Sequence, residues 1–558
     1  MRRVRFYASS SWRCRSLTAV VGIGLATWGA LVPAGAQNEI SPTQQPVAID
    51  WPSVARDVQA ISPHLVSPPP NFAAGFSAEV DRELTGFAVE NKEAFRPLAH
   101  LNLFIAPAYP DTKTVPIPVL APIDTTRYLA EIGRTGLLPQ DASVSYLAPS
   151  VKRMQFLAKT GGYDVLVRVH EDLLKRHRIT NTELVTVHLG ATGMVYELGA
   201  GAATRGTPVR DKQLQALYPD IRRFTGADDI SYGFSKYGVP YFASIACETR
   251  KWPVTRVISC SQVDPIMRAV LLDLRLIGGS PTALERRSDS CGPRPENVSS
   301  TFKFYPPGDL PDALSQGGRG GVKTKICWAP GNFRFPLRAA NAFANTQIFL
   351  HSGDCGGRTN QIQMSGGRYK CKQNPTKILE KRESHRENYA YPWRDTYCEV
   401  RNDNSRNPPD CGQPIGGHEG QDIRPHECIP NGQRCKIDLF EVVAVTRGKA
   451  FWTEKNHIRL VAEDGTGLYY MYLHMSPAAL QGAGMKLGEW VSVKQGDNVG
   501  KIGNWLGTER NATTAHLHFE IRKPGPPYCA GFGCTSSPYW TLIRAYEQLI
   551  EMQGMIAE

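Results

Sequence analysis

The sequence predicts an α+β N-terminal domain followed by a mainly antiparallel β domain. At roughly 150 residues per domain, a chain of 558 residues has room for several domains. Its 51 glycines and 41 prolines favour loops and β-structure over helical bundles. Helical and strand patterns are mixed in the first half of the chain, whereas short strand patterns separated by turn residues dominate the second half.

The first 36 residues have the three parts of a bacterial signal peptide. A basic stretch, MRRVRFYASSSWRCR, precedes the apolar run SLTAVVGIGLATWGALV, and Ala34-Gly35-Ala36 offers a small-x-small cleavage site before Gln37. We therefore expect a periplasmic or secreted protein. The alternative is an uncleaved anchor, because the apolar run is near spanning length. We expect no stable transmembrane segment after cleavage of the signal.

The next two regions differ in composition. Residues 37–75 are rich in Pro, Ser and Gln, which predicts a linker or loosely packed arm. Residues 76–285 are predicted to form one α+β accessory domain. Its helical or strand-to-helix patterns lie at 121–133, 163–179 and 264–279, where Gly278-Gly279 is expected to end the helix, and its strand patterns lie at 182–200 and 238–249.

The remainder of the chain is predicted to hold the second domain. Residues 286–335, rich in Gly, Pro and Ser, are expected to connect the two domains. Residues 336–525 have the short strands and turns of the β domain. Residues 526–558 are expected to form a C-terminal disulfide loop and a helix at 537–553.

Twelve of the 13 cysteines follow the predicted signal peptide, because Cys14 lies within it. An even number in an exported protein predicts a disulfide framework. The lack of any C-x-x-C pair argues against a structural zinc knuckle. We expect local bridges between neighbours, such as Cys428 with Cys435 and Cys529 with Cys534, although sequence does not fix the connectivity.

The formal net charge of +12 predicts attraction to an anionic partner such as nucleic acid, lipid or a cell-wall polymer. The sequence has no basic patch interleaved with aromatic residues and no nucleic-acid-binding motif. It also has no G-x-S-x-G elbow and no phosphate-binding Gly-Lys loop. These absences argue against nucleic acid as a partner and against serine-hydrolase or nucleotide chemistry.

Candidate metal ligands occur in three short segments of the second domain. In TTAHLHFEIRKPG, residues 513–525, His516 and His518 would share one face of a strand at a separation of about 6.6 Å. Upstream, GGHEGQD supplies His418 and Asp422, and YLH supplies His474. Each segment alone carries little information, because a single strand histidine is usually packed or exposed. Together, they supply the imidazole and carboxylate ligands that zinc prefers.

In this order, GGHEGQD, YLH and HLHFE resemble the motifs of the lysostaphin/LytM-type zinc metallopeptidases, which cleave peptides of peptidoglycan. The stretch LGEWVSVKQGDNVGKIGNW before the last motif is also similar to that family. The resemblance covers residues about 336–525 and implies the family's duplicated hybrid motif fold.

The resemblance implies a role for each residue of the motifs. His418, Asp422 and His518 would bind Zn2+, and His474 and His516 would act in catalysis. One of these two histidines would accept a proton from the metal-bound water and the other would stabilise the oxyanion, in an order that the sequence leaves open. Residue Glu520 would either orient a ligand imidazole or be an ordinary structural carboxylate.

The sequence departs from the family pattern in two places. The stretch 503–519 is longer and more polar than the family's tight turn, and residues 424–440 form an insertion that contains two cysteines. These differences concern the substrate groove rather than the metal site. Several other histidines are expected to be packed or solvated without a role in the site: His170, His177, His188, His426 and His457.

The function implied by the resemblance is that of an exported zinc-dependent endopeptidase acting on peptidoglycan cross-links or stem peptides. The region 76–285 would restrict access, bind the wall or bind a cell-envelope partner. An alternative is an inactive LytM-like regulator that activates other wall hydrolases, but the five-residue set is complete here. A third possibility is a protease that acts on Gly-rich proteins by the same chemistry.

Overall fold

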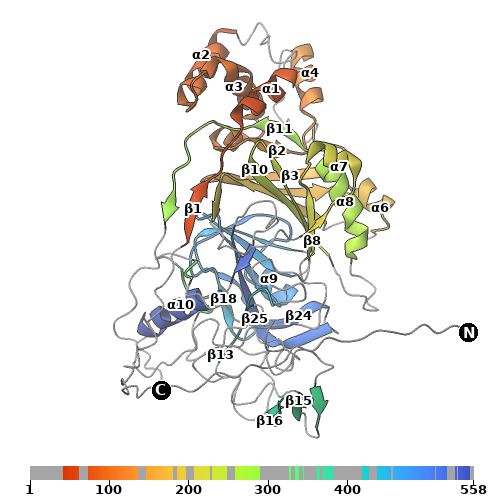
Figure 1. Cartoon of the computed structure of the whole chain (residues 1–558), viewed down its shortest axis with the longest axis vertical. Coiled ribbons are helices and arrows are strands. Elements are labelled where there is room, and N and C mark those ends of the chain that lie inside the picture. The colour runs from red at the N-terminus through yellow and green to blue at the C-terminus, as the bar shows by residue number, and fades with distance from the viewer. Residues whose placement is uncertain are drawn as a thin grey trace, which may run out of the picture. The chain divides into compact units, whose positions relative to one another are not determined.

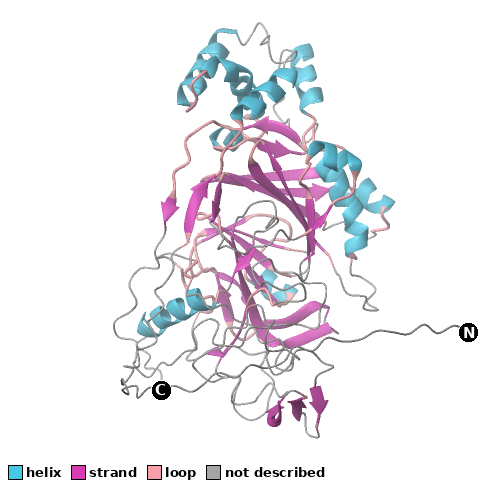
Figure 2. Cartoon of the chain, viewed as in Figure 1, coloured by secondary structure: helices cyan, strands magenta, loops and turns pink. Residues whose placement is uncertain are grey.

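The computed structural model describes residues 42–61, 73–135, 146–179, 185–196, 206–225, 229–247, 258–288, 326–328, 333–338, 343–344, 361–364, 368–372, 374–380, 397, 418–425, 437–453, 456–508, 511–523, 534–536 and 538–552. Over these residues the chain contains helices and antiparallel sheets, and it is mostly β-structure (Figure 1, Figure 2). The predicted signal peptide at 1–36 lies outside them.

The helices of the described residues are mostly in the first half of the chain. They are α1 (Trp51–Ile61), α2 (Ala73–Gly86), α3 (Arg96–Ile105), α4 (Thr125–Thr135), α6 (Glu171–Arg176), α7 (Lys212–Leu217), α8 (Cys260–Leu272), α9 (Pro477–Gly482) and α10 (Tyr539–Met552), with 3-10 turns η3 (Lys92–Phe95) and η4 (Pro110–Thr114). Helix α8 begins after Ser259, whose backbone N–H donates to the Gln262 side chain at 3.1 Å. It buries Val263, Ile266 and Val270, at the spacing of one helical face.

Two large antiparallel sheets account for most strands. One is seven-stranded, in the order β3 (Val151–Lys159), β4 (Gly162–Val169), β5 (Thr186–Thr192), β10 (Val239–Ala246), β9 (Asp229–Lys236), β8 (Arg222–Thr225), β7 (Thr207–Pro208). The other contains β13 (Phe343–Ala344), β17 (Gln421–Pro425), β25 (Asn511–Lys523), β21 (Tyr469–Leu473), β20 (Ile458–Ala462), β19 (Gly448–Trp452) and β22 (Val491–Val493), while β24 (Gly503–Thr508) and β26 (Cys534–Ser536) also pair with β25.

Four smaller sheets complete the described strands. They join β1 (Thr43–Pro46) with β6 (Met194–Tyr196) and β12 (Arg287–Ser288), β2 (Val119–Ala121) with β11 (Arg275–Gly278), β14 (Gln361–Gln363) and β16 (Asn374–Glu380) with β15 (Arg368–Cys371), and β18 (Glu441–Val443) with β23 (Asn498–Lys501).

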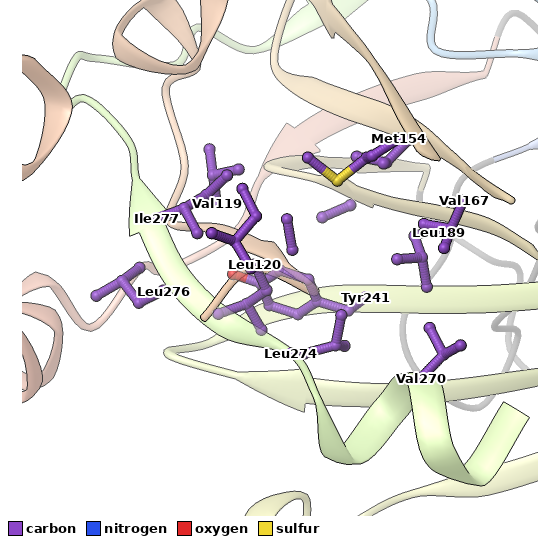
Figure 3. Close-up of a cluster of buried hydrophobic side chains, with 14 of the residues drawn as sticks. Val119, Leu120, Met154, Val167, Leu189, Tyr241, Val270, Leu274, Leu276 and Ile277 are labelled. Carbon is purple, nitrogen blue, oxygen red and sulfur yellow. The ribbon is translucent and has the colours of Figure 1, made fainter. Parts of the chain in front are cut away.

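One face of the seven-stranded sheet belongs to a large apolar core. Alternate residues of its strands point to this face, as the two-residue period of a strand requires. Figure 3 shows Val167, Leu189 and Tyr241 from the sheet in one cluster with Val270 of α8. The core therefore forms where the strand pattern and the helical pattern each supply an apolar face.

The opposite face of this sheet is buried against the second large sheet, and it is partly polar. His188 on β5 lies opposite Leu166 and Ser244 in the strand register. Its ring makes edge contacts with Phe451 and Trp490, at centroid distances of 5.4 and 5.7 Å. A buried polar face of this kind requires internal partners for its polar groups.

Asp164 supplies one such partner at this contact between the sheets. Its Oδ1 lies 2.8 Å from His188 Nε2 and accepts a hydrogen bond from Tyr469 Oη on β21 at 2.9 Å. Lys159 forms an ion pair with Asp164 and donates to Tyr469 Oη at 2.7 Å. The two sheets are therefore joined by a buried polar cluster as well as by apolar contacts.

Strand β25 lies at the centre of the second sheet, with β17 on one side and β21 on the other. Leu517, Phe519 and Ile521 are fully buried in the apolar core on one face. The intervening residues, His516, His518 and Glu520, point to the other face. Tyr469 of β21, which contacts the seven-stranded sheet, lies opposite Arg522 in the register.

The structure differs from the sequence interpretation between residues 37 and 75. Residues 43–46 of the expected linker or arm form strand β1, and residues 51–61 form helix α1, with Val54 and Val58 buried. The strand is held by backbone pairing to β6 and β12. Backbone N–H and C=O groups of almost any residue except proline, which lacks the N–H, can pair in this way, so composition does not reveal the strand.

A second difference concerns the helix expected at 264–279. Helix α8 ends at Leu272, and the apolar residues after it form strand β11, which pairs with β2. The apolar run fits both structures, since Leu274, Leu276 and Ile277 are all buried. His170 and His177 flank α6 as its N-terminal and C-terminal caps.

The described residues contain a disulfide between Cys247 and Cys260, which are 13 residues apart. The expected bridges within the pairs 428/435 and 529/534 involve residues outside the described part of the chain. Among the helices described, none is both long and apolar enough to span a bilayer. Residues 39–558 form one compact unit, and the domain boundaries within it stay predictions.

Candidate metal centre

The HEGQD segment is held tightly against β25. His418 lies just before β17, and Asp422 on β17 lies opposite His518 in the antiparallel register. Gly420 between them passes so close to β25 that an added Cβ would lie 2.8 Å from His518 Nε2 and closer still to the Phe519 carbonyl oxygen. A residue without a side chain is therefore needed to bring His418 and Asp422 beside His518.

The structure brings the three predicted ligands together. His418 Nε2 lies 2.8 Å from His518 Nδ1, and Asp422 Oδ1 lies 3.0 Å from His518 Nδ1 and 3.3 Å from His418 Nε2. All three side chains are buried. Two ligands bound tetrahedrally at about 2.1 Å lie about 3.4 Å apart. The three atoms could therefore hold one metal ion with little rearrangement.

The hydrogen bonds of His518 fix which of its nitrogens can bind a metal. Nε2 lies 3.0 Å from Glu520 Oε1, so Nε2–H donates to this carboxylate, and Nδ1, which lies 3.0 Å from Asp422 Oδ1, is the nitrogen that would face a metal ion once its own proton is released. Glu520 Oε2 in turn accepts from Arg522 Nε at 2.6 Å. Of the two alternatives for Glu520, the geometry favours the carboxylate that orients a ligand imidazole.

His474 occupies the end of β21, where the strand turns away. Its φ is +73°, a left-handed conformation that a non-glycine residue adopts at a cost in free energy. Two hydrogen bonds to Trp505 hold it there: the Trp505 amide donates to the His474 carbonyl at 3.0 Å, and His474 Nδ1 lies 2.9 Å from the Trp505 carbonyl oxygen. Nδ1–H is thus the donor, and Nε2 is left as an acceptor.

The two predicted catalytic histidines lie beside the ligand group. The rings of His474 and His516 are 4.6 Å apart, and those of His474 and His518 are 5.9 Å apart. His516 Nε2 lies 3.2 Å from Asp422 Oδ1. All five residues predicted from the motifs therefore gather at one place, and His516 reaches the same carboxylate oxygen as the two ligand histidines.

The electrostatics of the group favour a bound cation. Burial raises the pKa of Asp422, but His418 and His516 outweigh this and hold it well below its usual value, so the carboxylate is ionised. Burial lowers the pKa of His518, yet its hydrogen bonds to Asp422 and Glu520 raise it to about 9. A proton and a metal ion compete for this imidazole, so metal binding releases a proton and weakens in acid.

The pKa of His474 is shifted in the opposite direction from that of His518. Burial, followed by the nearby His516 and His518, lowers the pKa of His474 well below its ordinary value. Its imidazole is therefore neutral near pH 7, with the acceptor at Nε2 available to a proton donor. A neutral imidazole beside an ionised carboxylate and two imidazoles that could bind a metal could take part in general acid–base chemistry at a bound ion.

Within the described part of the chain, the other histidines singled out from the sequence lie outside the ligand group. His457 is buried at a turn, where its backbone N–H faces Thr453 Oγ1 at 3.3 Å. His188 is packed between the two sheets, and His170 and His177 cap α6. His426 lies outside the described residues.

Sequence reasoning missed Gly420, Trp505 and Arg522. The alternation of His516, His518 and Glu520 continues to Arg522, so strand periodicity could have indicated that this side chain shares their face. The requirement for glycine at position 420 and the backbone contacts of Trp505 depend on the packing of separate strands. No local sequence signal reports them.

No protein-family model matches the chain, and no curated protein sequence matches it. The functional interpretation therefore depends on the geometry of the site and on the motif resemblance.

Proposed function

We propose that the chain is an exported zinc-dependent endopeptidase that hydrolyses peptide bonds in peptidoglycan cross-links or stem peptides. The observation that carries the proposal is the convergence of His418 Nε2, Asp422 Oδ1 and His518 Nδ1 within 3.3 Å of one another. Two imidazoles and one carboxylate are a common ligand set of catalytic zinc, which keeps a further position for water. Zinc at such a site supplies a nucleophilic hydroxide near neutral pH and polarises the scissile carbonyl.

Residues of the chain would orient the metal ligands and transfer the protons of the reaction. Glu520 holds His518 in the tautomer that binds metal, and Asp422 supplies a negative charge that favours a divalent cation. His474 presents an acceptor at Nε2 that can take a proton from the attacking water. His516, 4.6 Å from it between ring centroids, can donate to the oxygen that becomes negative.

The proposal extends to the organisation and location of the protein. An α+β accessory domain at 76–285 would precede a mainly antiparallel β metallopeptidase domain at 336–525. A signal peptide at 1–36 would direct the chain to the periplasm or outside the cell. The net charge of +12 would then hold it near an anionic envelope.

The test compares the full chain with His418→Ala and with His177→Ala as a matched control, since His177 caps α6 away from the site. Zinc content is measured by elemental analysis, and the products released from purified sacculi are identified by mass spectrometry. We expect the wild type and the control to bind zinc and to release cut peptides. We expect His418→Ala to lose both properties.

The same experiment separates the alternatives. Bound zinc without cleavage of any wall peptide would favour a regulator of other wall hydrolases. Cleavage of a Gly-rich protein, with sacculi left intact, would favour a protease for protein substrates. Absence of zinc from the wild type would refute the proposed metal centre.

A further inference from the structure

A buried ionic chain links the metal site to the seven-stranded sheet. Glu520 Oε1 lies 3.0 Å from His518 Nε2, and its Oε2 accepts from Arg522 Nε at 2.6 Å. Arg522 Nη1 lies 3.8 Å from Oδ2 of Asp229, the first residue of β9. The same Asp229 oxygen accepts from Arg459 Nη2 on β20 at 3.0 Å.

Each member of this chain of contacts is shielded from water. Asp229 is 5%, Arg459 4%, Arg522 9% and Glu520 1% exposed. Charges buried to this degree interact far more strongly than charges on the surface. A change in one of them therefore alters the orientation and hydrogen-bond strength of the next.

Two residues of the seven-stranded sheet, Asp229 and Ser244, take part in this series of ionic contacts. Asp229 is paired with Ala246 in the register of β9 and β10, and Ser244 of β10 accepts a hydrogen bond from Arg459 Nη1 at 2.8 Å. Arg459 thus belongs to the second large sheet but is hydrogen-bonded to two residues of the seven-stranded sheet. Asp229 stands at the start of β9, and its Oδ2 faces both arginines.

The charges around Arg522 connect Asp229 to Glu520. Arg522 faces three carboxylates, because its Nη2 also lies 3.4 Å from Glu419 Oε2. Burial lowers the pKa of Arg522, while Glu520, Asp229 and Glu419 raise it more. Without the Asp229 charge, the positive charge of Arg522 would interact more strongly with the Glu520 carboxylate. Glu520 would then be a weaker acceptor for His518 Nε2–H, and His518 Nδ1 a weaker metal ligand.

We propose that Asp229 is a positioning residue for the metal ligand His518 and acts on it through Arg522 and Glu520. The inference rests on the metal centre of the proposed function. It assigns the seven-stranded sheet a part in the metal affinity of the site, in addition to its part in folding. A purely structural role for Asp229 would affect stability alone.

The experiment uses the full chain with Asp229→Asn, which keeps the shape of the side chain and removes its charge. The matched control is Tyr469→Phe, which removes the hydrogen bond to Asp164 at the same contact between the sheets but removes no atom of the Asp229–Arg522–Glu520 chain of contacts. Zinc affinity is measured by competition with a chromophoric chelator. The absorption spectrum of the cobalt-substituted protein reports the ligand geometry independently of activity.

We expect Asp229→Asn to weaken zinc binding by about 3- to 10-fold and to change the cobalt spectrum, since outer partners of metal ligands commonly contribute 10- to 100-fold and Asp229 acts through two residues. We expect Tyr469→Phe to lower the Tm and to leave zinc affinity at the wild-type value. If Asp229→Asn does not fold, Ser244→Ala, which only releases Arg459, is expected to weaken zinc binding by about twofold.

Three results would overturn the inference. Wild-type zinc affinity in Asp229→Asn, or in Ser244→Ala where that variant is used, removes the connection to His518. Equal loss of affinity in the variant and in Tyr469→Phe shows general loosening of the contact between the sheets. Failure of the wild-type protein to bind zinc or cobalt refutes the proposed metal centre and this inference with it, so the two failures are distinguishable.

Discussion

The substitution Gly420→Ala tests how closely β17 and β25 must approach to build the metal site. The added Cβ would lie 2.8 Å from His518 Nε2 and 2.9 Å from Glu520 Cγ. Ordinary contact between such atoms begins at about 3.5 Å, so these contacts alone require the two strands to separate by about 0.7 Å. The Phe519 carbonyl oxygen, which cannot rotate away, is closer still.

This displacement is large compared with the tolerance of a metal site. Metal–ligand distances must hold to within about 0.2 Å, and a shift of β17 moves Asp422 and His418 away from His518 together. We therefore expect Gly420→Ala to weaken zinc binding by at least about 100-fold. Overpacking of this kind also typically costs about 1–3 kcal/mol of folding stability.

The control is Gly482→Ala in α9, where an added Cβ meets no atom within 4 Å. This change is expected to leave zinc affinity unaltered and to keep or slightly raise the Tm, because alanine is a better helix former than glycine. Zinc affinity by chelator competition and Tm by calorimetry are measured for both variants. Wild-type zinc affinity in Gly420→Ala would show that the observed closeness of the strands is not required for the site.

Three further predictions concern metal, pH and the contact between the sheets. Zinc at 100 times its Kd should raise the free energy of unfolding by about 2.7 kcal/mol, and a Tm unchanged by zinc or chelator would contradict this. Burial lowers the pKa of His188 to about 4. The unfolded chain then binds a proton that the folded chain does not, so stability should fall by up to about 3 kcal/mol as pH decreases from about 6.5 to 4, and urea unfolding of His188→Gln should lack this part of the pH dependence. Tyr469→Phe should lower stability by about 1–3 kcal/mol, because buried Asp164 loses a donor; equal urea midpoints would argue against the hydrogen bond.

The sequence singled out five residues that lie together in the structure, but it did not indicate the residues around them. The alternation that places His516 and His518 on one face is local, because every second residue of a strand points the same way. The meeting of His418 and Asp422 with this strand came from the motif resemblance. It could not come from spacing, since the pairing of β17 with β25 joins residues about a hundred positions apart.

The parts of the fold that the sequence did not predict depend on contacts between residues that are far apart in the sequence. Strand β1 exists because the backbones of β6 and β12 are available to it. The run after Leu272 is apolar enough for either a helix or a strand, and its pairing with β2 decides between them. The contact of Asp229 with Arg459 joins two sheets, and no pattern within either segment predicts it.

The two faces of β25 have different environments: one packs into the apolar core and the other carries polar side chains. Leu517 and Phe519 are buried in the apolar core, while their immediate neighbours His516 and His518 face the candidate metal centre. A deletion of one residue within this strand would exchange the two sets, placing histidines in the interior and leucine at the ion. Chain length can therefore vary only outside this strand, and the segment that holds the chemistry is also the one least able to tolerate a shift in register.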